Sequence, residues 1–140
     1  MDVLFLIGRI LLVALFIQSG STVHLLMRQQ GIAYARMYNV PAPELTVPLT
    51  GIVAVLGGLS VVFGVWGDLG ALLLVGFLIP VSYYMHGFWR EEDPMQRANQ
   101  MAHLTKNVAV LGGALVLFYV WNQLQGDAGL SLTEPLFGRG

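Results

Sequence analysis

Residues 47–66 read VPLTGIVAVLGGLSVVFGVW, a run of 20 residues without a charged side chain. A bilayer core is about 30 Å thick, and a helix needs about 20 mostly apolar residues to cross it. Three other stretches also meet this requirement, at residues 3–27, 69–89 and 103–124. The sequence therefore predicts four membrane-spanning helices. The first run lacks the basic segment and small-residue cleavage site of a signal peptide, so we expect it to remain as a helix.

The composition agrees with a protein embedded in a membrane. Hydrophobic residues make up 56% of the 140 residues and charged residues only 11%, whereas soluble domains carry about 25% charged residues. These values exclude an ordinary soluble globule and a disordered chain. The net charge of −1 leaves no basic surface for nucleic acid. Because cysteine is absent, a redox role would need a bound cofactor, a quinone or a partner.

The connections between the four runs predict a single all-α domain over residues 1–140. We expect an integral membrane antiparallel four-helix transmembrane bundle in up-down-up-down order. Residues 28–44 and 90–100 are read as polar connections, and residues 125–140 as a polar tail outside the bilayer. The Gly67-Asp68 pair predicts a tight turn, which makes the second and third helices neighbours.

Basic residues predict the orientation, because they favour the cytoplasmic side of a membrane. The first and third connections hold four arginines, and Lys106 lies just inside the fourth helix, whereas the opposite side holds Arg139. We therefore expect both termini outside the cytoplasm. Trp66 and Trp121 end their helices on that side, where an aromatic belt is expected at the membrane surface.

Arg9 is a charged residue inside the first span. Charges inside a span are costly and are often functional. On a helical wheel Arg9 shares a face with Phe16, Gly20 and His24, and we expect this face to point into the bundle. Two interpretations remain open. The side chain either extends to the lipid headgroups, or it is a buried cation that pairs with an acidic residue (Asp68 or Asp127) or with an anionic ligand.

A second polar cluster is expected at the cytoplasmic end. His24 and His86 lie near the ends of the first and third helices, and His103, Lys106 and Asn107 share one face at the start of the fourth. Histidines at one membrane level can hydrogen-bond a quinone headgroup or a small anion. The alternative is that each is an ordinary interfacial polar residue. No ligand spacing indicates a metal site.

An internal repeat is suggested by residues 53–66 (VAVLGGLSVVFGVW) and 108–121 (VAVLGGALVLFYVW). Ten of the fourteen positions are identical. Shared membrane composition and an ancient duplication both explain this similarity.

Several short motifs occur along the chain in this order: Gly8-Arg9, Ser19-Gly20, Gly57-Gly58, His86-Gly87-Phe88-Trp89, Asp93-Pro94, Lys106-Asn107 and Gly112-Gly113. In their order and spacing, the chain resembles the DoxX family of small four-helix membrane proteins over about residues 4–120.

The resemblance implies a multi-pass protein of the bacterial inner membrane in a redox context. Family members include proteins similar to a subunit of thiosulfate:quinone oxidoreductase or of terminal quinol oxidase, and others resemble membrane partners of oxidoreductases. Members often carry a glutamate four residues before the second glycine of the pair that corresponds to Gly57-Gly58. This chain has Ala54 at that position. If the family glutamate pairs with the arginine of the first helix, the resemblance implies that Arg9 lacks this partner here.

Three function hypotheses follow. The first is a quinone-linked redox membrane subunit that binds a quinone or a small ligand in the cytoplasmic-side polar pocket. The second is a non-catalytic anchor for a soluble oxidoreductase docked on residues 90–100. The third is a small transporter or lipid-binding protein, although no acid lies deep in a span to couple ions. The expected partners are the lipid bilayer, a soluble or membrane-bound oxidoreductase and a second copy of the chain. No catalytic residue is predicted.

Overall fold

The computed structural model describes residues 2–124 and 129–137, and every regular element in this part of the chain is helical. The elements in chain order are α1 (Asp2–Ser19), the π-helix η1 (Gly20–Leu26), α2 (Arg28–Met37), α3 (Pro43–Phe63), α4 (Gly67–Met85), the 3₁₀ turn η2 (Phe88–Arg90) and α5 (Pro94–Leu124).

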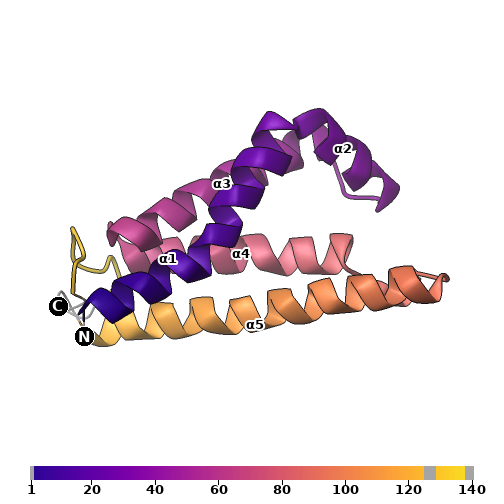
Figure 1. Cartoon of the computed structure of the whole chain (residues 1–140). Helices are drawn as coiled ribbons and strands as arrows, with labels where there is room; N and C mark the ends of the chain where they lie inside the picture. Colours follow the sequence, from indigo (N-terminus) through magenta and orange to yellow (C-terminus); the bar gives the residue numbers. More distant parts are fainter. Residues whose placement is uncertain (1, 125–128, 138–140) are drawn as a thin grey trace.

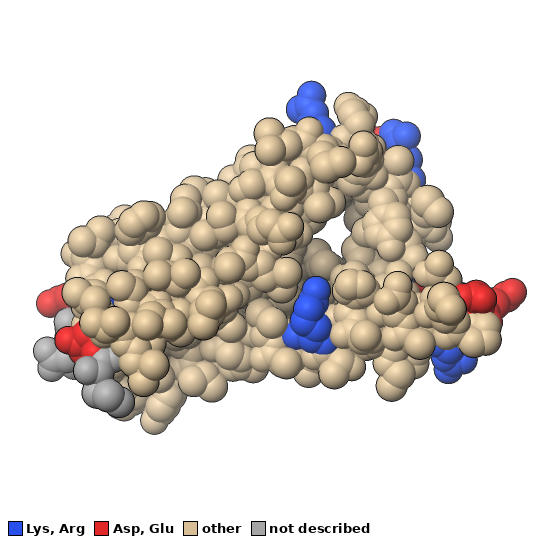
Figure 2. All heavy atoms as spheres, in the orientation of Figure 1, with Lys and Arg blue, Asp and Glu red and all other residues tan. Residues whose placement is uncertain are grey.

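Four helical stretches are long and apolar enough to cross a membrane: Asp2–Leu26, Pro43–Phe63, Gly67–Arg90 and Pro94–Leu124. Most Lys, Arg, Asp and Glu side chains on the face drawn in Figure 2 lie toward its two ends. The surface between the ends is uncharged except for one basic side chain beside the opening. A multi-pass all-α membrane protein is therefore confirmed. The side of the membrane on which each end lies stays a prediction.

The helices form an antiparallel bundle that is open along one side. In Figure 1 α3 packs on α1 and α4, and α4 packs on α5. Helices α1 and α5 approach each other where α1 begins and α5 ends, and they diverge toward α2, which lies across the wide end. We call the end where α1 begins and α5 ends the terminal end, and the opposite end the α2 end.

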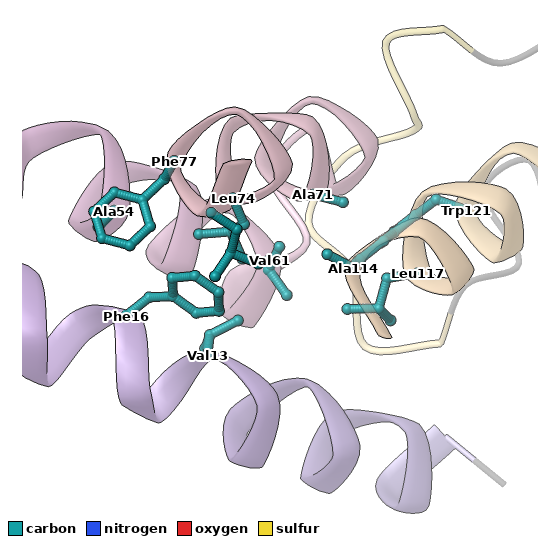
Figure 3. Close-up of a cluster of buried hydrophobic side chains, with 11 residues drawn as sticks. Val13, Phe16, Ala54, Val61, Ala71, Leu74, Phe77, Ala114, Leu117 and Trp121 are labelled. Atoms are coloured by element: carbon teal, nitrogen blue, oxygen red, sulfur yellow. The ribbon is translucent and has the colours of Figure 1, made fainter. Parts of the chain in front are cut away.

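The core is a strip of apolar side chains along the narrow part of the bundle (Figure 3). The rings of Phe16 and Phe77 meet edge to face with their centroids 5.8 Å apart. At the terminal end the indole of Trp121 is fully buried against Gly67. Trp121 lies in the last turn of α5, as predicted, but its ring fills the core between α4 and α5 and is not exposed as a member of an aromatic belt would be. Trp66 remains half exposed.

Glycines set the close approach of α3 and α4. A Cβ added to Gly70 would lie 3.0 Å from the carbonyl oxygen of Gly57 and 2.4 Å from Oγ of Ser60. In the second repeat segment, the residue that corresponds to Gly57 is Gly112, and a Cβ added to Gly112 would have no neighbour within 4 Å. The two repeat segments thus resemble each other in sequence but not in packing.

Helix α2 occupies part of residues 28–44, for which the sequence predicts only a polar connection. Its buried positions Gly31, Ile32 and Ala35 lie on one face and pack with Val47 of α3. A short amphipathic helix of this kind can cover the open end of a bundle, although it is not apolar enough to span the membrane.

The other helices begin earlier than predicted. Pro43 begins α3 four residues before the expected start, and Pro94 begins α5 nine residues before residue 103. Proline suits the first turn of a helix, because its missing N–H has no partner there. The Asp93 side chain caps α5 by accepting a hydrogen bond from the Gln96 N–H at 2.8 Å.

The turn between α3 and α4 lies at Gly64–Val65–Trp66, so the Gly67-Asp68 pair begins α4 instead of forming the turn. The C-terminal segment 129–137 packs on this turn. The N–H groups of Leu132 and Thr133 donate to the carbonyl oxygens of Phe63 (3.1 Å) and Gly64 (3.0 Å). Residues 129–137 are therefore part of the folded unit; residues 125–128 and 138–140 of the predicted tail lie outside the described residues.

Candidate functional site

A cavity of about 440 Å³ lies at the α2 end, where the helices diverge. Figure 2 shows an opening in the surface at this end, between α2 and α5. Four of the six predicted site residues line the cavity: His24, His86, Lys106 and Asn107. The rest of the wall is mostly apolar and includes Phe16, Val23, Val47, Phe77, Leu78 and Val81.

His24 is held against α3 by its ring nitrogen Nδ1. This atom lies 3.0 Å from the carbonyl oxygen of Val47 and 3.1 Å from Oγ1 of Thr50. The edge of the ring faces Phe77, with the centroids 5.6 Å apart. The imidazole is therefore fixed in one orientation on the cavity wall.

Two glycines make room for this histidine. A Cβ on Gly51 would lie 2.4 Å from the Cβ of His24, and a Cβ on Gly20 would lie 2.8 Å from the carbonyl oxygen of Gly51. His24 also lies within the π-helix Gly20–Leu26. Such π-helical turns are rare and occur frequently at functional sites. The local backbone thus brings His24 close to α3.

His86 ends α4 and lies next to α5. Its ring stacks on the ring of His103, with centroids 5.0 Å apart and planes 18° apart. Its Nδ1 lies 2.8 Å from Oε1 of Gln100, a side chain that is only 5% exposed. His103 does not line the cavity itself and contacts it through His86.

Gln100 continues the contacts of His86 toward α2. Its Nε2 donates to the hydroxyl oxygens of Tyr38 (2.9 Å) and Tyr34 (3.3 Å). The Tyr38 hydroxyl in turn donates to Oε1 of Glu91 at 3.1 Å. A chain of hydrogen bonds thus runs from Glu91 through Tyr38 and Gln100 to His86.

The hydrogen-bonding neighbour Tyr34, burial and the carboxylate of Glu91 all raise the pKa of Tyr38 above its usual range. The hydroxyl therefore keeps its proton and remains a donor. Sequence reasoning missed this chain. One signal was available, because Gln100 lies on the same helical face as His103 and Asn107.

Asn107 and Lys106 occupy the α5 side of the cavity. Asn107 is 5% exposed, and its Nδ2 donates to Oγ of Ser82 at 3.2 Å, which joins α5 to α4. The Lys106 side chain is exposed to the outside as well as to the cavity. The cavity thus has an ammonium donor at its rim and an amide on its wall.

Arg9 lies at the terminal end, so the structure does not bring it together with the other five predicted residues. Its guanidinium donates to Oγ of Ser131 (3.0 Å) and to the carbonyl oxygen of Leu130 (2.9 Å). It also lies over the rings of Phe5 and Trp121, at 5.1 and 5.5 Å from their centroids. Because the side chain has no exposed surface, it does not extend to lipid headgroups.

The predicted pairing of Arg9 with Asp68 is wrong. The Asp68 carboxylate accepts hydrogen bonds from the backbone N–H groups of Leu136 (2.9 Å) and Phe137 (2.6 Å). The other predicted partner, Asp127, lies outside the described residues. Ala54, at the position where the family resemblance implies a glutamate, is fully buried in the core next to Gly20.

In residues 2–124 and 129–137, no three His, Cys, Asp or Glu side chains lie in an arrangement that could hold a metal ion. The cavity residues instead suit an organic ligand, because apolar side chains dominate and the polar groups are few and fixed.

Four long apolar helices with a cavity at one end of the bundle define a small multi-pass membrane protein with a candidate ligand site. The chain belongs to the DoxX family, whose family model matches residues 4–87. The match covers the Gly8-Arg9, Ser19-Gly20, Gly57-Gly58 and His86-Gly87 pieces, and it ends before α5. Comparison with curated proteins and with solved structures found no match.

Proposed function

We propose that this DoxX protein binds the headgroup of a membrane quinone in the cavity at the α2 end, as a membrane subunit of a redox system. The observation that carries the proposal is the convergence of His24 and His86 on one mostly apolar cavity. Its volume of about 440 Å³ lies in the range of about 300–1,000 Å³ that is typical of small-molecule sites.

The walls suit the two parts of a quinone. The rings of Tyr34 and Tyr84 line the cavity and can contact a flat ring, and the two histidines with Lys106 present polar atoms to its oxygens. An isoprenoid chain would leave through the opening between α2 and α5 toward the lipid. In this function the chain holds and orients the headgroup, while a partner oxidoreductase exchanges electrons with it.

A second candidate function is an anchor for that oxidoreductase. Residues 90–97 include the exposed charged side chains of Arg90, Glu92, Asp93 and Arg97 next to the exposed apolar side chain of Met95. A surface with this mixture of charged and apolar side chains favours docking of a soluble protein. The two functions are compatible, because Glu91 connects this segment to the cavity through Tyr38.

The test is to release the protein from its own membranes in mild detergent and to analyse it by native mass spectrometry. We expect a bound mass that matches a quinone in the wild type and its loss in His86→Ala. The control is Tyr119→Ala, which removes an exposed aromatic ring of α5 that does not line the cavity. Equal quinone retention by folded His86→Ala would contradict the assignment of the cavity.

The anchor is tested in the same preparation. Glu92→Gln with Arg97→Gln removes two exposed charges without touching the cavity. If the segment docks a partner, this variant loses a copurifying protein subunit and keeps the quinone. A subunit that stays bound in this variant would refute docking on residues 90–97.

A further inference from the structure

The ring nitrogens of the two cavity histidines are not equivalent, because Nδ1 of each is already engaged by the protein. For His24, the partner at 3.0 Å is the carbonyl oxygen of Val47, which can only accept a hydrogen bond. The second neighbour, the Thr50 hydroxyl, directs its own hydrogen to the backbone oxygens of Thr46 (2.7 Å) and Val47 (3.0 Å). Nδ1 of His24 is therefore the nitrogen that carries the hydrogen.

The same conclusion holds for His86, through the hydrogen-bond chain that ends at Glu91. The carboxylate of Glu91 can only accept, so the Tyr38 hydroxyl donates to it and offers its own lone pair to Gln100. This fixes the orientation of the Gln100 amide, with Nε2 toward Tyr38 and Oε1 toward His86. Since Oε1 can only accept, Nδ1 of His86 also carries the hydrogen.

With Nδ1 of both rings bound to the protein, Nε2 is the nitrogen left for a ligand. In a neutral imidazole with hydrogen on Nδ1, Nε2 is only an acceptor. A quinol hydroxyl can donate to this atom and can still accept a hydrogen bond from the Lys106 ammonium. A quinone carbonyl oxygen can only accept a hydrogen bond, and so can Nε2. If the two atoms faced each other, each would lose its hydrogen bond with water and gain none in return.

We infer that the cavity recognises hydroxyl groups and therefore binds a quinol more tightly than the corresponding quinone, with Glu91, Tyr38 and Gln100 as positioning residues for His86. This inference rests on the proposed function, because it presupposes that the ligand is of the quinone class. Sites built around a hydrogen bond to a ligand hydroxyl discriminate strongly against analogues that lack it.

The experiment measures two properties of the full chain in detergent at neutral pH. The first is the binding of duroquinol and of duroquinone under anaerobic conditions, by isothermal titration calorimetry. We expect duroquinol to bind at least about tenfold more tightly, which corresponds to ~1.4 kcal/mol. The second is the ¹⁵N NMR spectrum of histidine-labelled protein, which distinguishes the two neutral tautomers and the protonated ring. We expect hydrogen on Nδ1 of His24 and His86.

Tyr38→Phe removes the hydroxyl that orients Gln100. We expect this variant to lose most of the preference for duroquinol and to show a mixture of His86 tautomers, while His24 is unchanged. Tyr119→Phe serves as the matched control, because it removes an exposed hydroxyl from the half of α5 that lies far from Gln100. We expect this variant to keep the preference for duroquinol and the histidine tautomers of the wild type. The wild-type spectrum tests the inference even if Tyr38→Phe fails to fold.

The outcomes separate the two claims. If both probes bind equally, if duroquinone binds more tightly, or if either histidine carries its hydrogen on Nε2, the selectivity is refuted and the proposed function stands. If the folded wild type binds neither probe, the proposed function is refuted, and the selectivity falls with it.

Discussion

Arg9 and Asp68 carry opposite charges and are both fully buried at the terminal end, yet they bind the same C-terminal segment and not each other. Arg9 donates to the carbonyl oxygen of Leu130 and to Oγ of Ser131. Asp68 accepts from the two N–H groups of residues 136–137. Segment 129–137 thus connects α1 to α4 through charge-assisted hydrogen bonds, which are stronger than neutral ones.

Asp68→Ala should release the last residues of this segment. The substitution removes both side-chain acceptors of the N–H groups at positions 136–137. A hydrogen bond to a charged group contributes up to about 3 kcal/mol, and less at residues that are half exposed to water, as Leu136 and Phe137 are. We expect a lower thermal unfolding temperature and faster hydrogen exchange of the peptide covering residues 129–137, measured by mass spectrometry.

The matched control is Glu134→Gln, which removes a negative charge from the same segment without removing a side-chain hydrogen bond. Its exchange should equal that of the wild type. Equal protection of residues 129–137 in Asp68→Ala would show that the carboxylate does not hold the segment.

The repeat can be tested with one substitution in each of its copies. Gly57→Ala places a Cβ 3.0 Å from Cδ2 of Leu74 and 3.1 Å from Cβ of Leu73, so these parts of α4 must shift by a few tenths of an ångström. Gly112→Ala meets nothing within 4 Å and replaces glycine by a better helix former.

We therefore expect Gly57→Ala to lower the unfolding temperature in detergent and Gly112→Ala to leave it unchanged or raise it slightly. The two variants should differ because Gly57 packs closely against α4, whereas Gly112 has no close neighbour. Similar losses in both variants would indicate that the two copies are structurally equivalent, against the observed packing.

The four spans could be located from sequence because length and apolar composition alone decide which stretches cross a membrane. Their ends could not. The first turns of α5, before His103, are mostly polar and, apart from Gln100, exposed, so hydropathy gives no signal there. The informative residues are the cap Asp93 and Pro94. Helix α2 was missed for the same reason, since only three of its ten residues are buried.

The candidate site was predicted in part. Helix lengths place His24, His86 and the start of α5 at one level, so their grouping follows from counting residues along the spans. The roles of Gln100 and Tyr38 depend on how α2 folds over the α2 end, and no local pattern gives that. The partners of Arg9 were missed because they include backbone oxygens of segment 129–137, which have no sequence signature.

The raised pKa of Tyr38 predicts a pH dependence. Tyrosine in an unfolded chain has a pKa of about 10. Because the pKa is raised in the folded protein, the contribution of Tyr38 to stability is complete below that value and is lost as the pH rises through its folded-state pKa. We expect the difference in phenolate absorbance between wild type and Tyr38→Phe to develop at higher pH in folded than in denaturant-unfolded protein. If Tyr38 titrated at the same pH in folded and unfolded protein, its contacts with Tyr34 and Glu91 would not raise its pKa.

Gly51→Ala should disturb the cavity without changing any group that contacts a ligand. The added Cβ would lie 2.4 Å from the Cβ of His24, so the histidine must move away from α3 and lose its hydrogen bond to the Val47 carbonyl oxygen. Loss of a bond of this kind costs about 0.5–1.5 kcal/mol, and we expect weaker duroquinol binding and a changed His24 ¹⁵N signal. Gly76→Ala in α4 is the control, because its Cβ meets nothing within 4 Å. Equal binding by both variants would mean that the position of His24 against α3 does not matter for the ligand.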